Sequence, residues 1–149
     1  MTLDGGYFWG DPQAKVCNAN CSRNGVVDST HAFELTSNWL IQHVESGLCV
    51  TASGTGALSM EKCVFDQLSQ MFVNDYTRIR NKETTLTNKG TNATLTGKLD
   101  GTAAAGAGDD SAGEAGQWST WAYFPNTKQL RNQYTANVAL GYPRCLATC

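Results

Sequence analysis

Six cysteines are the residues whose type and spacing say most about chemistry in this chain. None of them forms a C-x-x-C pair and the chain has 2 histidines, so the spacing does not offer the four converging ligands of a zinc site. Six cysteines in 149 residues are instead typical of an exported protein stapled by disulfides. Four of them form two C-x-x-x-C groups at opposite ends of the chain, which predicts that the ends are stitched together: Cys17, Cys21, Cys145 and Cys149.

Histidines and carboxylates are the other groups that could support catalysis, and their pattern indicates no enzyme. The sequence contains no G-x-S-x-G, no H-E-x-x-H and no phosphate-binding loop. We expect His31 to be a structural hydrogen-bonding residue and His43 to lie on the surface. Four carboxylates could pair in space as those of glycosidases do, but the sequence does not show their separation: Asp66, Asp75, Glu34 and Glu83. We therefore expect no catalytic residues, no cofactor and no metal.

Short strands must position these residues. The stretch 38–75 holds four short apolar runs, rich in β-branched residues and separated by turns with Gly and Ser, which predicts four strands. Aromatic residues that close such a unit recur at Phe33, Phe72 and Trp118, with separations of 39 and 46 residues. This periodicity predicts three copies of one four-strand unit. The Gly- and Ala-rich segment 101–116 predicts a flexible surface loop, which explains the longer second interval.

The third copy does not fit into the end of the chain. After Leu140 too few residues remain for two more strands, whereas the first 35 residues carry a surplus strand and a closing run. We therefore expect the two ends to complete the third unit together. The expected core consists of Trp39, Leu40, Ile41, Leu48, Val50, Leu58, Met60 and Phe72, with Ile79, Leu86, Leu95, Leu99, Trp118, Leu130 and Leu140 from the other copies.

Three motifs carry a family resemblance. A Q-x-F or Q-x-W run closes the unit, a Cys-Val-Thr run precedes it and an N-D-x-T-x-I run follows it. Together they resemble the ricin B-type β-trefoil lectins, over residues 31–99 and in part over 116–142. The resemblance implies an all-β, circularly permuted member of that family, with one β-trefoil domain over 1–149. Its three four-stranded repeats would span about 36–75, 76–124, and 125–149 completed by 1–35.

The resemblance also implies disulfide pairs, because in this family a disulfide links the second and third strands of a repeat. Cys49 and Cys63 occupy those strands in the first complete copy. A Cys21–Cys145 bond would imitate that pair in the third copy, and Cys17–Cys149 would join the two cysteines that are left. Six cysteines allow 15 pairings, so this connectivity is one prediction among several.

The galactose site of the family does not survive in this sequence. The family holds galactose with an Asp, an aromatic ring and an Asn, since a carboxylate binds sugar hydroxyls and a ring covers the apolar sugar face. In the first copy Thr51 replaces the Asp, Glu61 or Met60 replaces the ring and Ser69 replaces the Asn. Gln70 is retained from the closing motif, where a structural role is as plausible as a binding one.

Other residues could bind a different glycan. In the second copy Thr87 or Asn88 replaces the Asp, and in the third copy Gly141 does. Candidate carbohydrate-binding residues are therefore Thr51, Glu61, Gln70, Asn88, Asn92, Tyr142 and Trp9. The ring of Trp9 belongs to the cluster Tyr7-Phe8-Trp9, which could stack on sugar or plug the floor of a barrel.

These features predict a secreted carbohydrate-binding protein whose partner is a glycan or a glycoprotein. The alternative is a secreted protein-binding scaffold such as a toxin delivery subunit, an effector or a protease inhibitor. Acceptor tripeptides at Asn20 and Asn92 favour a glycoprotein, although the first residues lack the pattern of a signal peptide. A net charge of -2 with a pI near 5.6 argues against nucleic acid, and no apolar run is long enough for a membrane span.

Overall fold

The computed structural model describes residues 15–21, 29–80, 83–97, 103–106, 119–132 and 144–149. These residues form an all-β structure with two 3₁₀ turns, η1 (Ser29–His31) and η2 (Leu68–Gln70), and they contain no α-helix. The strands are β1 (Val16–Asn20), β2 (Phe33–Leu35), β3 (Ile41–His43), β4 (Cys49–Ala52), β5 (Leu58–Glu61), β6 (Phe72–Arg80), β7 (Glu83–Asn88), β8 (Thr94–Gly97), β9 (Ala103–Gly106), β10 (Trp121–Phe124), β11 (Gln129–Asn132) and β12 (Arg144–Thr148).

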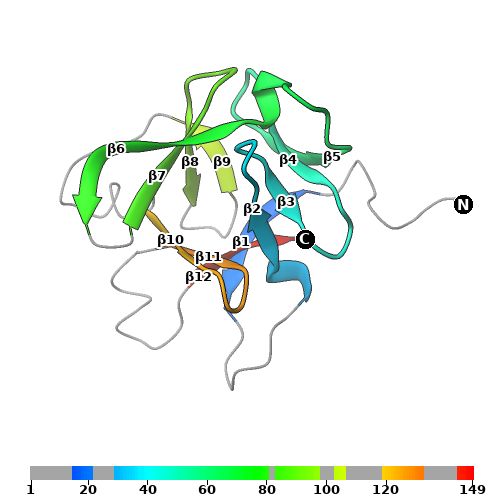
Figure 1. Cartoon of the computed structure of the whole chain (residues 1–149), viewed down its shortest axis with the longest axis vertical. Coiled ribbons are helices and arrows are strands. Elements are labelled where there is room, and N and C mark those ends of the chain that lie inside the picture. Colours follow the sequence, from blue (N-terminus) through cyan, green and yellow to red (C-terminus); the bar gives the residue numbers. More distant parts are fainter. Residues whose placement is uncertain (1–14, 22–28, 81–82, 98–102, 107–118, 133–143) are drawn as a thin grey trace, which may run out of the picture.

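The strands pair antiparallel and fall into two sheets (Figure 1). One sheet has the order β2-β3-β4-β5. The other has the order β1-β12-β11-β10-β7-β8-β9, and β6 pairs with β7 beside it. Isolated bridges from Lys15 to Ser59 and from Leu40 to Met71 connect the two sheets. Backbone hydrogen bonds therefore tie both sheets into one structure.

The first and last strands bring the two ends of the described chain together. β1 pairs with β12 over its full length, from Val16 opposite Thr148 to Asn20 opposite Arg144. Figure 1 shows this pair as the blue and red arrows near the centre of the molecule. The Arg144 guanidinium donates to the Asn18 side-chain oxygen at 2.8 Å and to its backbone oxygen at 2.9 Å. The predicted meeting of the two ends is confirmed.

Two disulfides are formed, and both are among the predicted pairs. Cys49 is bonded to Cys63, and Cys21 is bonded to Cys145 across 124 residues of sequence. The structure differs from the sequence prediction at the third pair. Cys17 and Cys149 carry free thiols.

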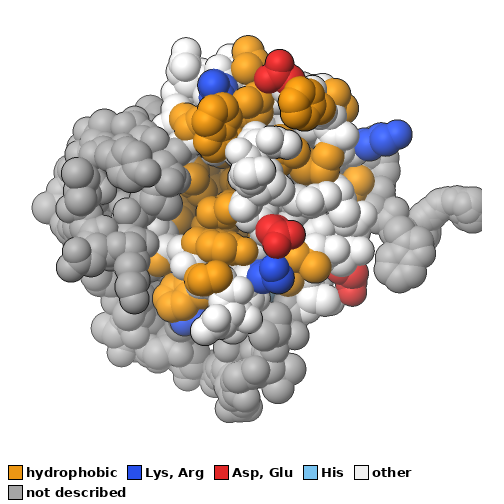
Figure 2. Space-filling model, viewed as in Figure 1, with side chains coloured by type: hydrophobic (Ala, Val, Ile, Leu, Met, Phe, Trp, Pro, Cys, Tyr) orange, Lys and Arg blue, Asp and Glu red, His pale blue; other side chains and the backbone are white. Residues whose placement is uncertain are grey.

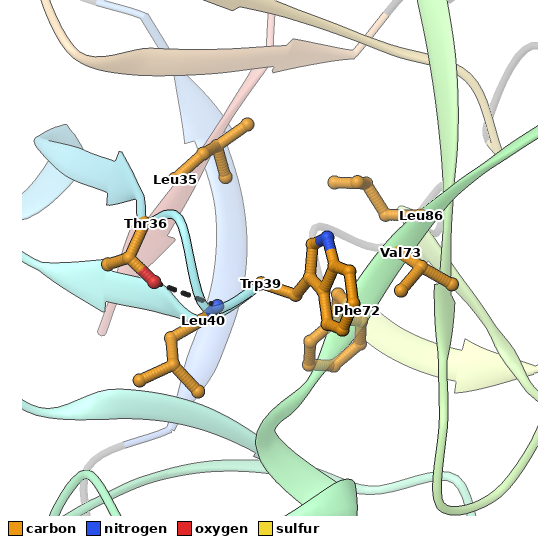
Figure 3. Close-up of a pocket in the computed structure, with 7 residues that line it drawn as sticks. All are labelled: Leu35, Thr36, Trp39, Leu40, Phe72, Val73 and Leu86. Atoms are coloured by element: carbon orange, nitrogen blue, oxygen red, sulfur yellow. Dashed lines mark hydrogen bonds between the residues drawn. The ribbon is translucent and has the colours of Figure 1, made fainter. Parts of the chain in front are cut away.

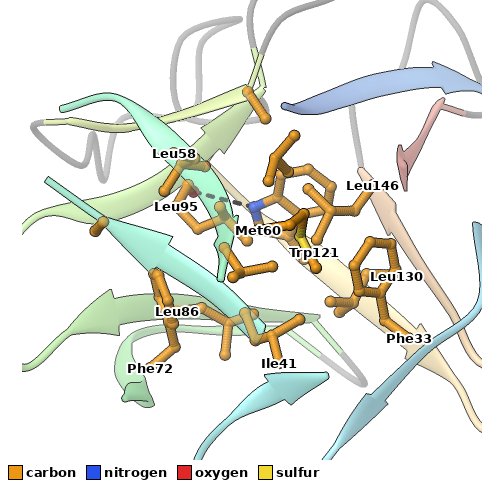
Figure 4. Close-up of a cluster of buried hydrophobic side chains, with 14 residues drawn as sticks. Phe33, Ile41, Leu58, Met60, Phe72, Leu86, Leu95, Trp121, Leu130 and Leu146 are labelled. Atoms are coloured by element: carbon orange, nitrogen blue, oxygen red, sulfur yellow. Dashed lines mark hydrogen bonds between the residues drawn. The ribbon is translucent and has the colours of Figure 1, made fainter. Parts of the chain in front are cut away.

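A cluster of buried apolar side chains fills the space between the sheets (Figure 4). Trp121 is its largest member, and the indole nitrogen donates to the Leu95 carbonyl at 3.0 Å, so no polar atom of the ring is left unpaired. Trp118, which we expected in the core, lies outside the described residues. The structure also does not describe the side chains of three other expected core residues, Ile79, Leu99 and Leu140. The core predictions confirmed are Ile41, Val50, Leu58, Met60, Phe72, Leu86, Leu95 and Leu130.

Two sequence predictions about burial and loops are wrong. Trp39 is 50% exposed and not part of the core, because it lies in the turn between β2 and β3. Residues 103–106 are a strand, β9, although they lie inside the segment predicted to be a loop. β9 pairs with β8 from Gly97 opposite Ala103 to Thr94 opposite Gly106, and these backbone bonds do not depend on side-chain bulk.

The two disulfides should contribute unequally to stability. A disulfide stabilises the fold by restricting the unfolded chain, and this effect grows with the length of the loop that it closes. The expected loss of unfolding free energy is roughly 5 kcal/mol for the 124-residue separation and roughly 3 kcal/mol for the 14-residue one. We expect the Cys21→Ser/Cys145→Ser variant to have a lower free energy of unfolding in urea than Cys49→Ser/Cys63→Ser. A larger loss from the shorter loop would contradict this account of the fold.

Candidate functional site

A cavity of about 350 Å³ opens where the turn between β2 and β3 faces β6 and β7. Most of the residues that line it are apolar: Leu35, Thr36, Trp39, Leu40, Phe72, Val73 and Leu86. In Figure 3 the Trp39 indole lies between Leu35 and Leu40 on one side and Phe72, Val73 and Leu86 on the other. Pockets that bind small molecules are of this kind, mostly apolar with a few polar groups.

The turn from Thr36 to Leu40 holds Trp39 over the cavity. The Thr36 hydroxyl oxygen accepts bonds from the backbone N–H groups of Asn38 at 3.3 Å and Leu40 at 3.1 Å. The Trp39 N–H donates to the Thr36 carbonyl at 3.1 Å, and the Trp39 carbonyl accepts from Phe72 at 2.8 Å. Trp39 has φ 64°, a left-handed conformation that is costly for a bulky residue. The turn therefore keeps a strained, half-exposed indole at the rim.

No charged side chain among the described residues lines the cavity, and the charged groups of Lys89, Lys128 and Glu34 belong to neighbouring segments. The Lys89 ammonium is 4.5 Å from the centre of the Trp39 ring, which is a cation–π distance. Lys128 lies 3.0 Å from the Glu34 carboxylate, and this hydrogen bond and charge raise the pKa of Lys128. Figure 2 shows hydrophobic side chains running across this face of the molecule with few charged ones among them.

Thr51 and Gln70, two of the predicted sugar-binding residues, are buried and bonded to the protein. The Gln70 amide nitrogen donates to the Lys62 carbonyl at 2.8 Å and to the Thr51 hydroxyl at 3.1 Å. Its amide oxygen accepts from the Val64 N–H at 2.8 Å. These bonds fasten the segment before β6 to β4. Gln70 thus has the structural role that the sequence left open.

Asn88 is also buried and fully engaged. Its side-chain nitrogen donates to the Ser69 carbonyl at 2.8 Å, and its oxygen accepts from the backbone N–H groups of Gly90 at 3.0 Å and Thr91 at 2.9 Å. Close contact explains the glycine, because a Cβ at residue 90 would lie 3.0 Å from the Ser69 nitrogen. Asn88 therefore shapes the turn between β7 and β8.

Of the other predicted site residues, the two that the structure describes, Asn92 and Glu61, lie on different elements. Asn92 is exposed at φ 58°, in that same turn. Glu61 is exposed at the end of β5, where its carboxylate accepts from the Ser59 hydroxyl at 2.7 Å. Tyr142 and Trp9 lie outside the described residues.

His43 is buried rather than on the surface as predicted. Nε2 lies 3.0 Å from the Ser29 carbonyl and Nδ1 lies 2.9 Å from the Ser46 hydroxyl, so both ring nitrogens bind within the protein. The ring also packs on Phe33, with 5.1 Å between centroids. Burial lowers the pKa of His43 below 6.5. His31 is buried at the end of η1, as Gln70 is at the end of η2, which agrees with a structural role.

Sequence reasoning did not single out Trp39 and Thr36, which line the cavity, or Lys89, which contacts the Trp39 ring, as parts of a site. A signal was available in the polar triplet Thr36-Ser37-Asn38, which is typical of a turn and places the following Trp at its end. Nothing in the sequence brings Lys89, from the turn after β7, to that ring.

Metal ligation, membrane insertion and similarity to known proteins also bear on the kind of site. Within the described ranges, no group of three or more His, Cys, Asp or Glu side chains could hold a metal ion. No helix in the part of the chain that the structure describes has the length and apolarity needed to cross a membrane. No family model matches this chain, and no curated protein matches it.

The Gln70 bonds predict a structural rather than a binding phenotype. In Gln70→Ala, the Lys62 carbonyl and the Val64 N–H lose their partner, which should lower the free energy of unfolding by roughly 2 to 4 kcal/mol. Urea denaturation measures this, and Glu61→Ala is the control, with an expected change within about 0.5 kcal/mol because Glu61 is exposed. If the free energy of unfolding of Gln70→Ala equals that of the wild type, Gln70 has no structural role and is again a candidate for binding a ligand.

His43 should make stability depend on pH. Its folded pKa is lower than 6.5, so the unfolded chain binds more protons as the pH falls below 6.5 and folding stability is lost there. Protonation would also remove the Nδ1 acceptor that the Ser46 N–H uses. We expect the free energy of unfolding of His43→Gln to fall less than that of the wild type between about pH 7.5 and pH 5. Parallel pH profiles for the two proteins would refute this role.

Proposed function

We propose that this chain is a β-trefoil protein whose three repeats are β3–β6, β7–β10, and β11–β12 followed by β1–β2. A closed ring of backbone bonds around six strands supports this proposal. Four of its six steps are the strand pairs β2·β3, β6·β7, β7·β10 and β10·β11. The remaining two steps are the bridge from Leu40 to Met71 and the bond from the Phe33 N–H to the Lys128 carbonyl at 2.7 Å. The other six strands form the hairpin-like pairs β4·β5, β8·β9 and β12·β1.

The strand register supports the threefold repeat. Phe33 lies opposite His43, Phe72 opposite Asn88 and Trp121 opposite Asn132, which aligns the three copies residue by residue. Under this alignment twelve of the cluster's buried apolar residues form four sets of three, and the other two are Ala52 and Met60. The sets are Phe33, Phe72 and Trp121; Ile41, Leu86 and Leu130; Val50, Leu95 and Leu146; and Leu58, Ala103 and Val16.

The same alignment supports a divergent, circularly permuted member of the ricin B-type lectins. Cys49 and Cys145 become equivalent, as do Cys63 and Cys21, so the two disulfides are copies of one bond. Thr94 takes the cysteine position in the second repeat. Two disulfides in a chain of this length suit an oxidising environment, and we propose that the protein is secreted.

We infer that the protein binds carbohydrate at Trp39. The observation that carries this proposal is the half-exposed indole at the rim of a mostly apolar cavity. The left-handed φ belongs to the turn, because the equivalent Lys128 has φ 57°. What points to binding is that this position holds an aromatic ring that is half exposed. An indole covers the apolar face of a sugar ring, and the Thr36 hydroxyl and the Lys89 ammonium can bind sugar hydroxyls.

The galactose positions of the family are unsuitable for the same task. Thr51 and Gln70 are buried and bonded to each other at 3.1 Å. In the second repeat the equivalent pair, Thr96 and Ser119, is also hydrogen-bonded at 2.7 Å. The positions equivalent to Trp39 hold Thr84 and Lys128, so we expect one sugar site per chain rather than three.

A protein-binding scaffold is the second candidate. It is favoured by exposed apolar side chains on the segment before β6, where Val64, Phe65 and Leu68 are 46%, 79% and 51% exposed. A folded partner protein would cover such side chains, which a sugar ring would leave in water.

Binding to a broad array of immobilised glycans tests the sugar proposal. We expect the wild type to bind at least one glycan and Trp39→Asn to bind it at least tenfold more weakly, since the ring is lost. Asn tolerates a positive φ, so the turn and the thermal stability should be kept.

Phe65→Ala is the matched control, because it removes another exposed ring that does not line the cavity. Its glycan binding should equal that of the wild type. Silence of the wild type across the array would refute the sugar proposal, as would equal binding by Trp39→Asn. Tight binding of a purified secreted protein that is lost in Phe65→Ala would instead support the scaffold.

A further inference from the structure

The two free thiols, Cys17 and Cys149, lie together beside the strand pair that joins the ends of the chain. Cys17 is opposite Ala147 in the register of β1 and β12, and Cys149 is two residues beyond Ala147. Side chains two residues apart on a strand point to the same face, so Cys149 is on the face of Cys17. The backbone stays paired to this point, since the Cys149 N–H donates to the Lys15 carbonyl at 3.2 Å.

The two thiols have the same strand register as the two formed disulfides. Cys63 lies two residues beyond the residue opposite Cys49, and Cys21 lies two residues beyond the residue opposite Cys145, just as Cys149 does relative to Cys17. Each thiol donates to a backbone carbonyl, Cys17 to Ala147 at 3.6 Å and Cys149 to Lys15 at 3.8 Å. Diagonal neighbours on antiparallel strands are close enough for their side chains to meet. The two cysteines are therefore already side by side while both thiols are free.

We propose that Cys17 and Cys149 form a third disulfide by exchange with a small-molecule disulfide, and that this bond reopens more readily than Cys21–Cys145. Exchange starts at Cys149, because its side chain is exposed whereas Cys17 is half-buried. Burial, and then the hydrogen bond and charge of Cys149, raise the pKa of Cys17 to about 12, so Cys17 is the poorer first nucleophile.

The two exchange steps balance. The Cys149 thiolate attacks the small-molecule disulfide, which forms a mixed disulfide and releases one small thiolate. The Cys17 thiolate then attacks the Cys149 sulfur, which closes the Cys17–Cys149 bond and releases the second small thiolate. The two protons from the cysteines end on the two released thiols. The protein loses two electrons and the small-molecule disulfide gains them.

Two features make this bond the easier one to reduce. Cys149 is exposed, whereas Cys21 and Cys145 are 5% and 0% exposed and are shielded from a thiol reductant. With Cys21–Cys145 in place, the new bond closes only the short loop made of 17–21 and 145–149. A bond that closes a short loop restricts the unfolded chain little, so Cys17–Cys149 stabilises the folded protein less than Cys21–Cys145 does. The folded protein therefore favours the Cys17–Cys149 bond less strongly against reduction.

Titration of the purified full chain with mixtures of reduced and oxidised glutathione tests the proposal, with iodoacetamide as the quench and mass spectrometry as the readout. Under the most oxidising mixture we expect no alkylated cysteine. Under intermediate mixtures we expect alkylation of Cys17 and Cys149 alone. Trypsin cleaves after Lys15, Arg23 and Arg144, so the linked peptides 16–23 and 145–149 should lose two hydrogens when the third bond closes.

Cys17→Ser and Cys149→Ser are the matched controls. Each should keep Cys21–Cys145, and neither should show the loss of two hydrogens: in oxidising mixtures its one remaining thiol either stays open to alkylation or carries one glutathione as a mixed disulfide. Circular dichroism should match that of the wild type. The proposal is overturned if the folded wild type keeps both thiols alkylatable in the most oxidising mixture. It is also overturned if Cys21–Cys145 opens first during reduction.

Discussion

The antiparallel pairing of β1 with β12 is the interaction on which the rest of the structure depends. It joins strands that are more than a hundred residues apart in the sequence, so it closes a very long loop at a large entropic cost. The Cys21–Cys145 bond and the Arg144 contacts to Asn18 offset that cost. Once the pair is formed, Val16 and Leu146 reach the same buried cluster as the central strands, and the core is complete.

Two polar residues that the sequence suggested for sugar binding are hydrogen-bonded within the protein instead. Gln70 fastens the segment before β6 to β4, and Asn88 shapes the turn after β7, so neither has spare hydrogen-bonding groups for a ligand. A buried amide that gave up these partners to bind a ligand would lose more free energy than a contact at the surface provides. The exposed indole of Trp39 lies instead at the end of a turn, where a ring can face solvent without disturbing the core. The proposed site therefore lies at the turn between β2 and β3 and not at Gln70 or Asn88.

Local sequence patterns predicted the strands well where apolar runs alternate, and they failed where backbone bonding overrides side-chain character. Ala103–Gly106 lacks bulk and reads as a loop, yet it forms a strand because β8 offers it a backbone partner. Trp39 reads as core because it is aromatic, but a turn carries it to the surface. His43 reads as polar surface, but carbonyl and hydroxyl partners at Ser29 and Ser46 allow it to be buried.

The sequence by itself determined the all-β character, the recurring apolar positions and the cysteines that could pair. These properties follow from periodicity and residue type, which act over a few neighbouring residues. Only the tertiary structure decided which aromatic residue is buried, which polar residues are consumed by turns, and where a cavity opens. Those outcomes depend on contacts such as Lys89 with Trp39 or Gln70 with Thr51, between residues that are distant in the sequence and meet only in the folded chain.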